Sequence, residues 1–346
     1  MKLRPLVALA VALAVAPTAL AEPAKVGYPS SIASTGDSIT RAFNTGWFPY
    51  VDWPSNSWAT GTSSTVNSHY RRILAANASI SGRAYNDAAS GADMADLSGQ
   101  VSRAVGQRAE YVTILMGAND VCERSEAAMT PVATFRAQLD AALQALSAGL
   151  PDARIYVVSI PDVYRLWAVY RDSFSARLVW DVADICQSML ANAGSNAQAD
   201  VDRRNRVRQR NVDYNTQLAQ GCAALIHCRF DGNAVFNTDF LRSDVTTRDY
   251  FHPSVAGQTK LASVSWSATF GFSDAVAPVS TASLGAGGSV TLTASDNVGV
   301  AGIEYRLGNG AFTRYTAPVP LAAGATLTYR AVDVNGNVEA TKTMTG

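Results

Sequence analysis

Between residues 31 and 271, short apolar segments alternate with longer segments in which apolar residues recur every three or four positions. The short segments predict buried strands, and the longer ones predict amphipathic helices. We expect strands at 31–35, 110–116 and 154–160, and helices at 67–76, 94–105 and 131–150. Because alternating strands and helices form right-handed βαβ units, this part of the chain predicts a mostly parallel sheet covered by helices. Ligands bind such sheets beyond the carboxyl ends of the strands.

The pattern changes after residue 272. Residues 272–288 are rich in Ala, Ser and Gly and predict a linker. Beyond them, apolar and polar residues alternate in short runs at 289–294, 302–307 and 326–332, with Gly-Asn turns between the runs. This spacing is typical of a small antiparallel β-sandwich. We therefore expect an α/β domain over residues 28–271 and a small all-β domain over residues 289–346.

The first residues have the layout of a secretory signal. Lys2 and Arg4 precede an apolar stretch at 6–15, and the small residues Ala19 and Ala21 follow. We expect a cleavable signal over residues 1–21 and an exported, extracellular protein. A retained membrane anchor is less favoured, because the apolar stretch is short for a bilayer and the small residues suit cleavage.

The composition predicts a folded protein without a strongly charged partner. Hydrophobic residues make up 48% of the chain and charged residues 16%, which excludes a disordered chain. Because 28 basic residues balance 28 acidic ones, we expect no nucleic-acid partner. No Cys-x-x-Cys motif or Cys/His ligand spacing is present, so we expect no metal and no cofactor. The loop at 333–337 has a composition that suits calcium, although turn chemistry explains it more simply.

The four cysteines suit an exported protein with two disulfides. Four cysteines allow three pairings. Proximity along the chain favours Cys222–Cys228, which leaves Cys122–Cys186. Four reduced, buried thiols would instead suit a cytosolic protein, and that alternative conflicts with the predicted signal.

A candidate nucleophile follows the first predicted strand. The segment Gly36-Asp37-Ser38-Ile39-Thr40 stands at a strand-to-helix turn, where it can place the Ser38 hydroxyl at the carboxyl end of the strand. The Ser38 N–H would then face the cleft. A simple helix N-cap is the alternative, and the pentapeptide alone does not decide between the two.

Candidate hydrogen-bond donors follow the next two extended stretches. Gly91 comes after an extended stretch around 84–89, and Asn119 comes after the strand at 110–116. The Gly91 N–H, the Asn119 side-chain amide and the Ser38 N–H could surround one oxygen, as a tetrahedral oxyanion requires. Turn residues are a serious alternative for each position singly, but a weak one for all of them at successive strand ends.

The chain has three histidines from which to choose a base. We expect His69 to be a surface helix residue, because Arg and Tyr flank it, and His227 to be structural. His252 precedes Pro253, which suits the first position of a helix running to about 269, and a helix N-terminus helps to keep an imidazole neutral. Asp249 lies three residues earlier and can orient the His252 ring. An Asp-capped turn beside an ordinary helix is the plainer alternative.

These segments resemble, in order, the four blocks of the SGNH (GDSL) hydrolase family. The blocks are Gly36-Asp37-Ser38, Gly91, Gly117-Ala118-Asn119-Asp120 and Asp249-x-x-His252, and the match covers about residues 31–270. The resemblance implies a flavodoxin-like three-layer α/β/α sandwich with a five-stranded parallel sheet. It also implies a site in which Ser38 is the nucleophile, His252 the general base and acid, and Asp249 its orienting group. Ser38 N–H, Gly91 and Asn119 would form the oxyanion hole.

Two finer resemblances concern the other parts of the chain. The aromatic segment at 44–61 is similar to that of secreted actinobacterial members, although the cysteine pair that such members carry near 47–54 is missing here. The C-terminal part resembles Ig-like modules of bacterial secreted and surface proteins. That likeness makes a polysaccharide or a cell surface the expected partner of the small domain.

Two groups of large apolar side chains suggest the substrate. The first follows Ser38 and consists of Phe43, Trp47, Phe48, Tyr50, Trp53 and Trp58. The second follows the strand at 154–160 and consists of Tyr164, Leu166, Trp167, Tyr170, Phe174 and Trp180. Apolar walls suit a fatty-acyl chain, so we expect a lipase or esterase acting on small-molecule or lipid esters. The alternatives are a carbohydrate acetylesterase, a non-catalytic surface-binding protein, and aromatic residues that belong to the core.

Overall fold

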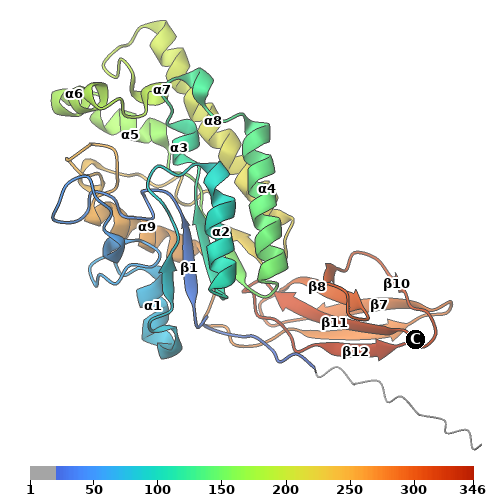
Figure 1. Cartoon of the computed structure of the whole chain (residues 1–346). Helices are drawn as coiled ribbons and strands as arrows, with labels where there is room; N and C mark the ends of the chain where they lie inside the picture. The colour runs from blue at the N-terminus through green and yellow to red at the C-terminus, as the bar shows by residue number, and fades with distance from the viewer. Residues whose placement is uncertain (1–20) are drawn as a thin grey trace, which may run out of the picture.

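The computed structural model describes residues 21–346, so the predicted signal, apart from Ala21, lies outside the described residues. The described chain forms an α/β part and a C-terminal β part, which Figure 1 shows side by side. Within these residues we find no helix with the length and hydropathy that a membrane span requires.

A five-stranded parallel sheet forms the centre of the α/β part. Its strands lie in the order β2-β1-β3-β4-β5, and every neighbouring pair is parallel. Their bounds are β1 Ile32–Gly36, β2 Ala84–Asn86, β3 Tyr111–Leu115, β4 Arg154–Val157 and β5 Cys228–Phe230. The three predicted strands are confirmed as β1, β3 and β4, and every residue in them is buried, as expected for a parallel sheet covered on both faces.

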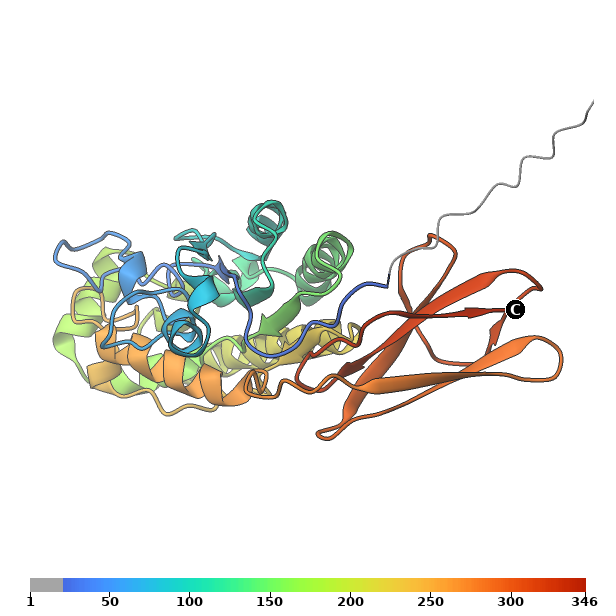
Figure 2. The same ribbon diagram turned by 90° about the horizontal axis from the view of Figure 1, so that it is seen from below.

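Helices cover both faces of this sheet (Figures 1 and 2). One layer contains α2 (Leu97–Gly106), α4 (Val132–Gly149) and α8 (Gln198–Ala223), and the other contains α1 (His69–Ala76) and α9 (Val255–Ala268). The shorter helices are α3 Ala118–Val121, α5 Val163–Tyr170, α6 Phe174–Val182 and α7 Gln187–Leu190. The three-layer α/β/α arrangement expected from the sequence is therefore present.

His69 does not lie at the surface as the sequence predicts, because its side chain is fully buried. Its Nε2 lies 2.8 Å from Ser265 Oγ, and its Nδ1 lies 2.9 Å from the Tyr111 hydroxyl. Burial lowers the pKa of His69 to about 3, so the ring is neutral. Ser265 donates its hydroxyl proton to the Leu261 carbonyl, so its oxygen accepts from Nε2–H. His69 therefore links α1, α9 and the sheet.

The C-terminal part contains two antiparallel sheets, in the strand orders β10-β7-β6 and β12-β11-β8-β9. The strands are β6 Val279–Leu284, β7 Ser289–Ser295, β8 Val300–Leu307, β9 Thr313–Arg314, β10 Val319–Pro320, β11 Thr326–Asp333 and β12 Lys342–Thr345. Val290, Leu327 and Ala331 belong to a hydrophobic cluster separate from that of the α/β part. The expected small all-β domain is therefore present. In the loop at 333–337, Asp333 accepts hydrogen bonds from the N–H groups of Asn335 and Asn337, as turn chemistry predicts.

The predicted linker at 272–288 is too long, because β6 lies inside it. Residues of β6 pair with β7 in an unbroken register from Val279↔Ser295 to Leu284↔Val290. The segment escapes a composition-based prediction because its side chains are mostly small, whereas the buried Ser280 is held by hydrogen bonds to Glu339. The β domain therefore begins at about residue 279.

The two parts share a buried polar interface at the amino-terminal end of β4. The Arg154 guanidinium is buried and donates to the carbonyls of Gly27 (2.7 Å) and Gly336 (3.1 Å) and to Asn337 Oδ1 (2.9 Å). The N-terminal segment joins the same interface, where Lys25 and Val338 exchange backbone hydrogen bonds. The β domain is therefore held at the edge of the sheet opposite to the carboxyl ends of the strands.

We predict that Arg154→Met lowers the free energy of unfolding by about 3 kcal/mol, because two carbonyls and an amide oxygen lose a buried, charged donor. Burial lowers the pKa of Arg154 to about 10, so the group is still protonated at pH 7. Urea unfolding followed by tryptophan fluorescence measures the change. Arg83→Met, at an exposed position, is the control. Equal stability of Arg154→Met and the wild type would contradict a stabilising interface.

Candidate active site

Ser38 lies two residues after the end of β1, at the carboxyl edge of the sheet. Gly36, with φ +141°, lets the chain turn there, because a Cβ atom would lie 2.3 Å from the Leu115 carbonyl oxygen. The neighbouring Asp37 is buried and accepts a hydrogen bond from the Ile39 N–H at 2.8 Å. Burial raises the pKa of Asp37 to about 7, and the nearby Asp120 carboxylate adds to this effect.

His252 and Asp249 complete a line of hydrogen bonds that begins at Ser38. The His252 Nε2 lies 2.7 Å from Ser38 Oγ, and Nδ1 lies 2.8 Å from Asp249 Oδ2. Burial raises the pKa of Asp249, but hydrogen bonds and the charge of His252 outweigh burial and hold that pKa below its usual range. Asp249 is therefore ionised at neutral pH and favours the His252 tautomer with a proton on Nδ1, which leaves Nε2 to accept the Ser38 proton.

The helix after His252 begins later than the sequence predicts. Its first residue is Val255 and not Pro253, and Ser254 is the N-cap, because its hydroxyl accepts from the Gly257 N–H. His252 is placed instead by a turn in which the Thr246 N–H donates to the His252 carbonyl. Phe43 packs on the His252 ring, with the ring centres 4.8 Å apart. His227, in contrast, is buried against Glu304 at the interface with the β domain.

Gly91 and Asn119 border the same hollow as Ser38 and His252, and its volume is about 400 Å³. Gly91 has φ +84°, and a Cβ atom there would meet nothing within 4 Å, so its backbone is open to an approaching ligand. The Asn119 side-chain amide donates one hydrogen to the Ala92 carbonyl at 2.7 Å. The amide has a second hydrogen, which can be offered to a ligand. The structure thus brings Ser38, Gly91, Asn119 and His252 to one hollow, with Asp249 bonded to His252.

Asp120 is a site residue to which sequence reasoning assigned no role. Its Oδ2 accepts from the Met94 N–H at 2.9 Å, and this bond joins the segment of Asn119 to the segment of Gly91. Burial raises the pKa of Asp120 to about 6. Its signal in the sequence is its place in the block Gly117-Ala118-Asn119-Asp120, whereas its partner Met94 is 26 residues away.

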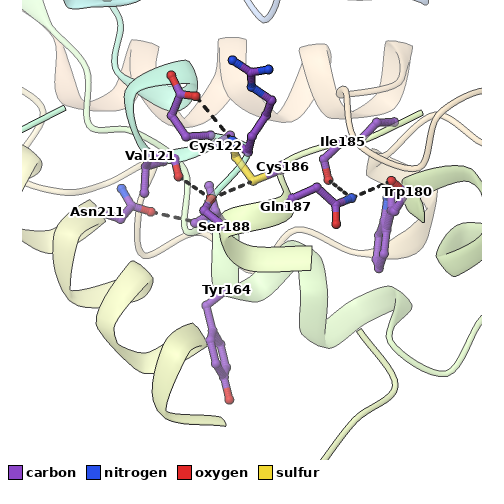
Figure 3. The surroundings of a disulfide bond; sticks show 12 residues. Val121, Cys122, Tyr164, Trp180, Ile185, Cys186, Gln187, Ser188 and Asn211 are labelled. Carbon is purple, nitrogen blue, oxygen red and sulfur yellow. Dashed lines mark hydrogen bonds between the residues drawn. A yellow bond between two sulfur atoms is a disulfide. The ribbon is translucent and has the colours of Figure 1, made fainter. Parts of the chain in front are cut away.

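The disulfides are Cys122–Cys186 and Cys222–Cys228, the pairs that the spacing favours. Cys122 and Cys186 line the hollow together with Ile185. Figure 3 shows Ser188 beside this bridge, where its hydroxyl donates to the Val121 carbonyl at 2.7 Å. The bridge therefore ties α3, which carries Asn119, to the segment around α7.

The predicted aromatic walls divide between the surface and the core. Three side chains of the first group are exposed, namely Trp47 (87%), Phe48 (69%) and Tyr50 (65%). Phe43 lines the hollow. Four others are buried in the core: Trp58, Trp167, Tyr170 and Trp180. In the second group, Trp167, Tyr170 and Trp180 thus belong to the core, which is the plainer interpretation of the sequence, whereas Phe174 is 72% exposed.

We predict that Asn119→Ala lowers kcat for an ester by about a hundredfold or more, because one preorganised donor to an oxyanion contributes about 3 kcal/mol. Steady-state kinetics on a soluble p-nitrophenyl ester measure the effect. Asn196→Ala, at an exposed position, serves as the control. A change confined to KM would mean that Asn119 binds substrate without stabilising the transition state.

Residues 32–264 match the family model described as GDSL-like Lipase/Acylhydrolase. Similar solved structures include the extracellular lipase of Streptomyces rimosus, at 20% identity over 69% of this chain and 99% of that one, with a TM-score of 0.42. They also include a family 3 carbohydrate esterase of Clostridium thermocellum, at 13% identity over 69% and 94%, with a TM-score of 0.37. No match was found among curated proteins.

Proposed function

Because the chain belongs to the GDSL-like lipase/acylhydrolase family, we propose that it is a serine hydrolase that cleaves carboxylic esters through an acyl-enzyme intermediate. The line from Ser38 Oγ through His252 to Asp249 carries this proposal, since it supplies a nucleophile, a base and an orienting carboxylate in contact. Ser38 N–H, Gly91 and Asn119 are the proposed oxyanion donors, because they border the same hollow.

The reaction follows from this geometry in two halves. His252 Nε2 accepts the Ser38 proton while Oγ attacks the ester carbonyl, and the negative charge that develops on the carbonyl oxygen is held by the three donors. When the tetrahedral species collapses, the carbon–oxygen bond to the alcohol breaks, and His252 returns the proton to the leaving alcohol. A water molecule then attacks the acyl-enzyme in the same way and releases the carboxylic acid and free Ser38.

The walls of the site favour an acyl ester with an apolar chain as the substrate. Phe43, Ile185 and Phe251 line the hollow at Ser38. A smaller, mostly apolar cavity of about 80 Å³ adjoins His252 and includes Leu166 and Phe240 in its lining. Burial of an alkyl chain in an apolar cavity is favourable, whereas burial of a sugar hydroxyl there contributes little to binding. We therefore propose a lipase or esterase activity.

A series of p-nitrophenyl esters from acetate to palmitate tests both the proposed ester hydrolysis and the proposed preference for an apolar acyl chain. We expect turnover of the series, with kcat/KM rising beyond acetate, and no turnover by Ser38→Ala. Release of acetate from acetylated xylan without an increase along the ester series would support a carbohydrate acetylesterase instead. A wild-type protein that is folded and inactive on every ester would overturn the hydrolase proposal.

Export is proposed on the N-terminal sequence, and the two disulfides are compatible with an oxidising compartment. We further propose that the C-terminal β domain is an Ig-like module that brings the site close to a polysaccharide or a cell surface. Cosedimentation of the full-length Ser38→Ala protein with insoluble polysaccharides and with whole cells tests this. Retention on neither would contradict the proposed role.

A further inference from the structure

Asn44 closes the surface loop that carries the exposed aromatic residues. Its backbone N–H donates to the Val51 carbonyl at 3.0 Å, so residues 44–51 form a loop with adjoining ends. The side chain of Asn44 is only 2% exposed, and its φ of +65° lies in the left-handed region that Asn tolerates better than most residues. An amide is thus buried at the base of this loop.

The orientation of the Asn44 amide is set by its two partners. Its Oδ1 accepts from the Tyr50 N–H at 2.5 Å, so the NH₂ group faces the other way. There it donates to Asp249 Oδ2, the oxygen that also faces His252 Nδ1. The remaining oxygen of Asp249 accepts from the N–H groups of Phe251 (2.8 Å) and His252 (3.0 Å). In the described chain, Asn44 is therefore the one donor to this carboxylate from outside its own turn.

A second contact holds the loop against the same turn. The guanidinium of Arg248, which directly precedes Asp249, donates to the carbonyl of Phe48 at 2.9 Å and to that of Gly46 at 2.6 Å. It also reaches the carbonyls of Asn44 and Trp47, each at 3.2 Å. The loop at 44–51 and the turn of Asp249 are therefore bonded at several points.

We propose that Asn44 is a positioning residue for the Asp249–His252 pair, a role that rests on the proposed ester hydrolysis. Asn44 belongs to the segment that begins at Ser38, in which the Phe43 N–H donates to the Ser38 carbonyl at 3.0 Å. The bond from Asn44 thus ties the orienting carboxylate to the segment of the nucleophile. It fixes the plane of the carboxylate, and with it the direction in which His252 presents Nε2 to Ser38 Oγ.

Asn44→Gly tests this role without straining the backbone, because glycine accepts the positive φ. The variant removes the amide and with it the hydrogen bonds to Asp249 and to the Tyr50 N–H. We expect kcat on p-nitrophenyl butyrate to fall about tenfold to a hundredfold, the range for a hydrogen bond to a charged group, while KM stays within about twofold. Asn44→Asp should lose more, because it places a carboxylate against Asp249.

The decisive measurement is the double variant. In an Asp249→Ala background no carboxylate remains to be positioned, so adding Asn44→Gly should cost less than about twofold more in kcat. Additive losses would overturn the proposal, because they would mean that Asn44 acts through the loop and not through Asp249. Full kcat in Asn44→Gly would overturn it as well.

Asn56→Ala is the matched control for a loosened loop. The Asn56 side-chain amide donates to the Thr45 carbonyl (3.3 Å) and hydroxyl (3.2 Å) and makes no hydrogen bond to Asp249. We expect its kcat to stay within about twofold of the wild-type value, and a loss equal to that of Asn44→Gly would count against the proposal. Absence of Ser38-dependent hydrolysis in the wild type would instead be a failure of the proposed function, so the two failures are distinguishable.

Discussion

The Ser38→Ala variant is expected to lose ester hydrolysis, with kcat lower by about 10⁴-fold or more, while the protein stays folded. Alanine removes the one atom that forms the covalent bond to the acyl group. Ser38 follows β1 by two residues, and its small side chain is only 7% exposed. Because alanine is of similar size, the substitution disturbs little packing. Steady-state kinetics on p-nitrophenyl butyrate, with circular dichroism for the fold, measure both parts of the prediction.

Ser102→Ala is the control for this variant, since Ser102 lies exposed on α2 and its hydroxyl bonds only within the helix, to the Ser98 carbonyl. Its kcat is expected to match that of the wild type. Retention of more than a few per cent of activity by Ser38→Ala would exclude Ser38 as the nucleophile, even if other residues of the hollow were essential.

The central strands could be predicted because each signal is contained within a few residues. β3 and β4 are short, mostly apolar segments and β1 is a short segment of apolar and small residues, as strands buried on both faces require. β5 was not predicted because it has only three residues and begins at Cys228, which is bridged to Cys222. A strand this short depends on its pairing with β4 and leaves little pattern in the sequence.

The candidate site could be predicted for a related reason. Ser38, Gly91 and Asn119 each follow a separate extended segment, and parallel strands end at one edge of the sheet. Residues whose roles depend on partners far away in the sequence could not be predicted. His69 has the sequence context of a surface residue, yet Tyr111 and Ser265, 42 and 196 positions away, make its burial possible. Asn44 likewise depends on Asp249, 205 positions away.

A buried polar group that loses its partner destabilises the fold, so such long-range contacts help to determine the structure. They leave no periodic pattern in the sequence from which they could be predicted. The interface of the β domain is a further example. In the sequence, Arg154 has the context of an ordinary strand residue. In the structure its guanidinium is buried and donates to the carbonyls of Gly27 and Gly336, which are far apart in the sequence. Composition predicted a loose linker because small residues in β6 resemble a spacer, whereas the pairing with β7 is visible only in three dimensions.

His252→Ala is expected to lower kcat about as far as Ser38→Ala, because Ser38 then has no base and the leaving alcohol has no acid. Asp249→Asn should lose less, because His252 remains 2.7 Å from Ser38 Oγ and can still accept its proton. The amide cannot stabilise an imidazolium, and it can favour the tautomer that has its proton on Nε2. The loss in Asp249→Asn thus reports how strongly orientation and charge assist a base that is still present.

The two variants are best compared at one pH and with one soluble ester, because their difference is the measured quantity. Phe43 and Phe251 both pack on the His252 ring, with centre distances of 4.8 and 5.0 Å, and these contacts keep the ring in place when the carboxylate is neutralised. The base therefore keeps its position but not its preferred tautomer, so we expect kcat of Asp249→Asn to exceed that of His252→Ala by about tenfold or more. Equal losses would mean that the carboxylate is as essential as the base itself.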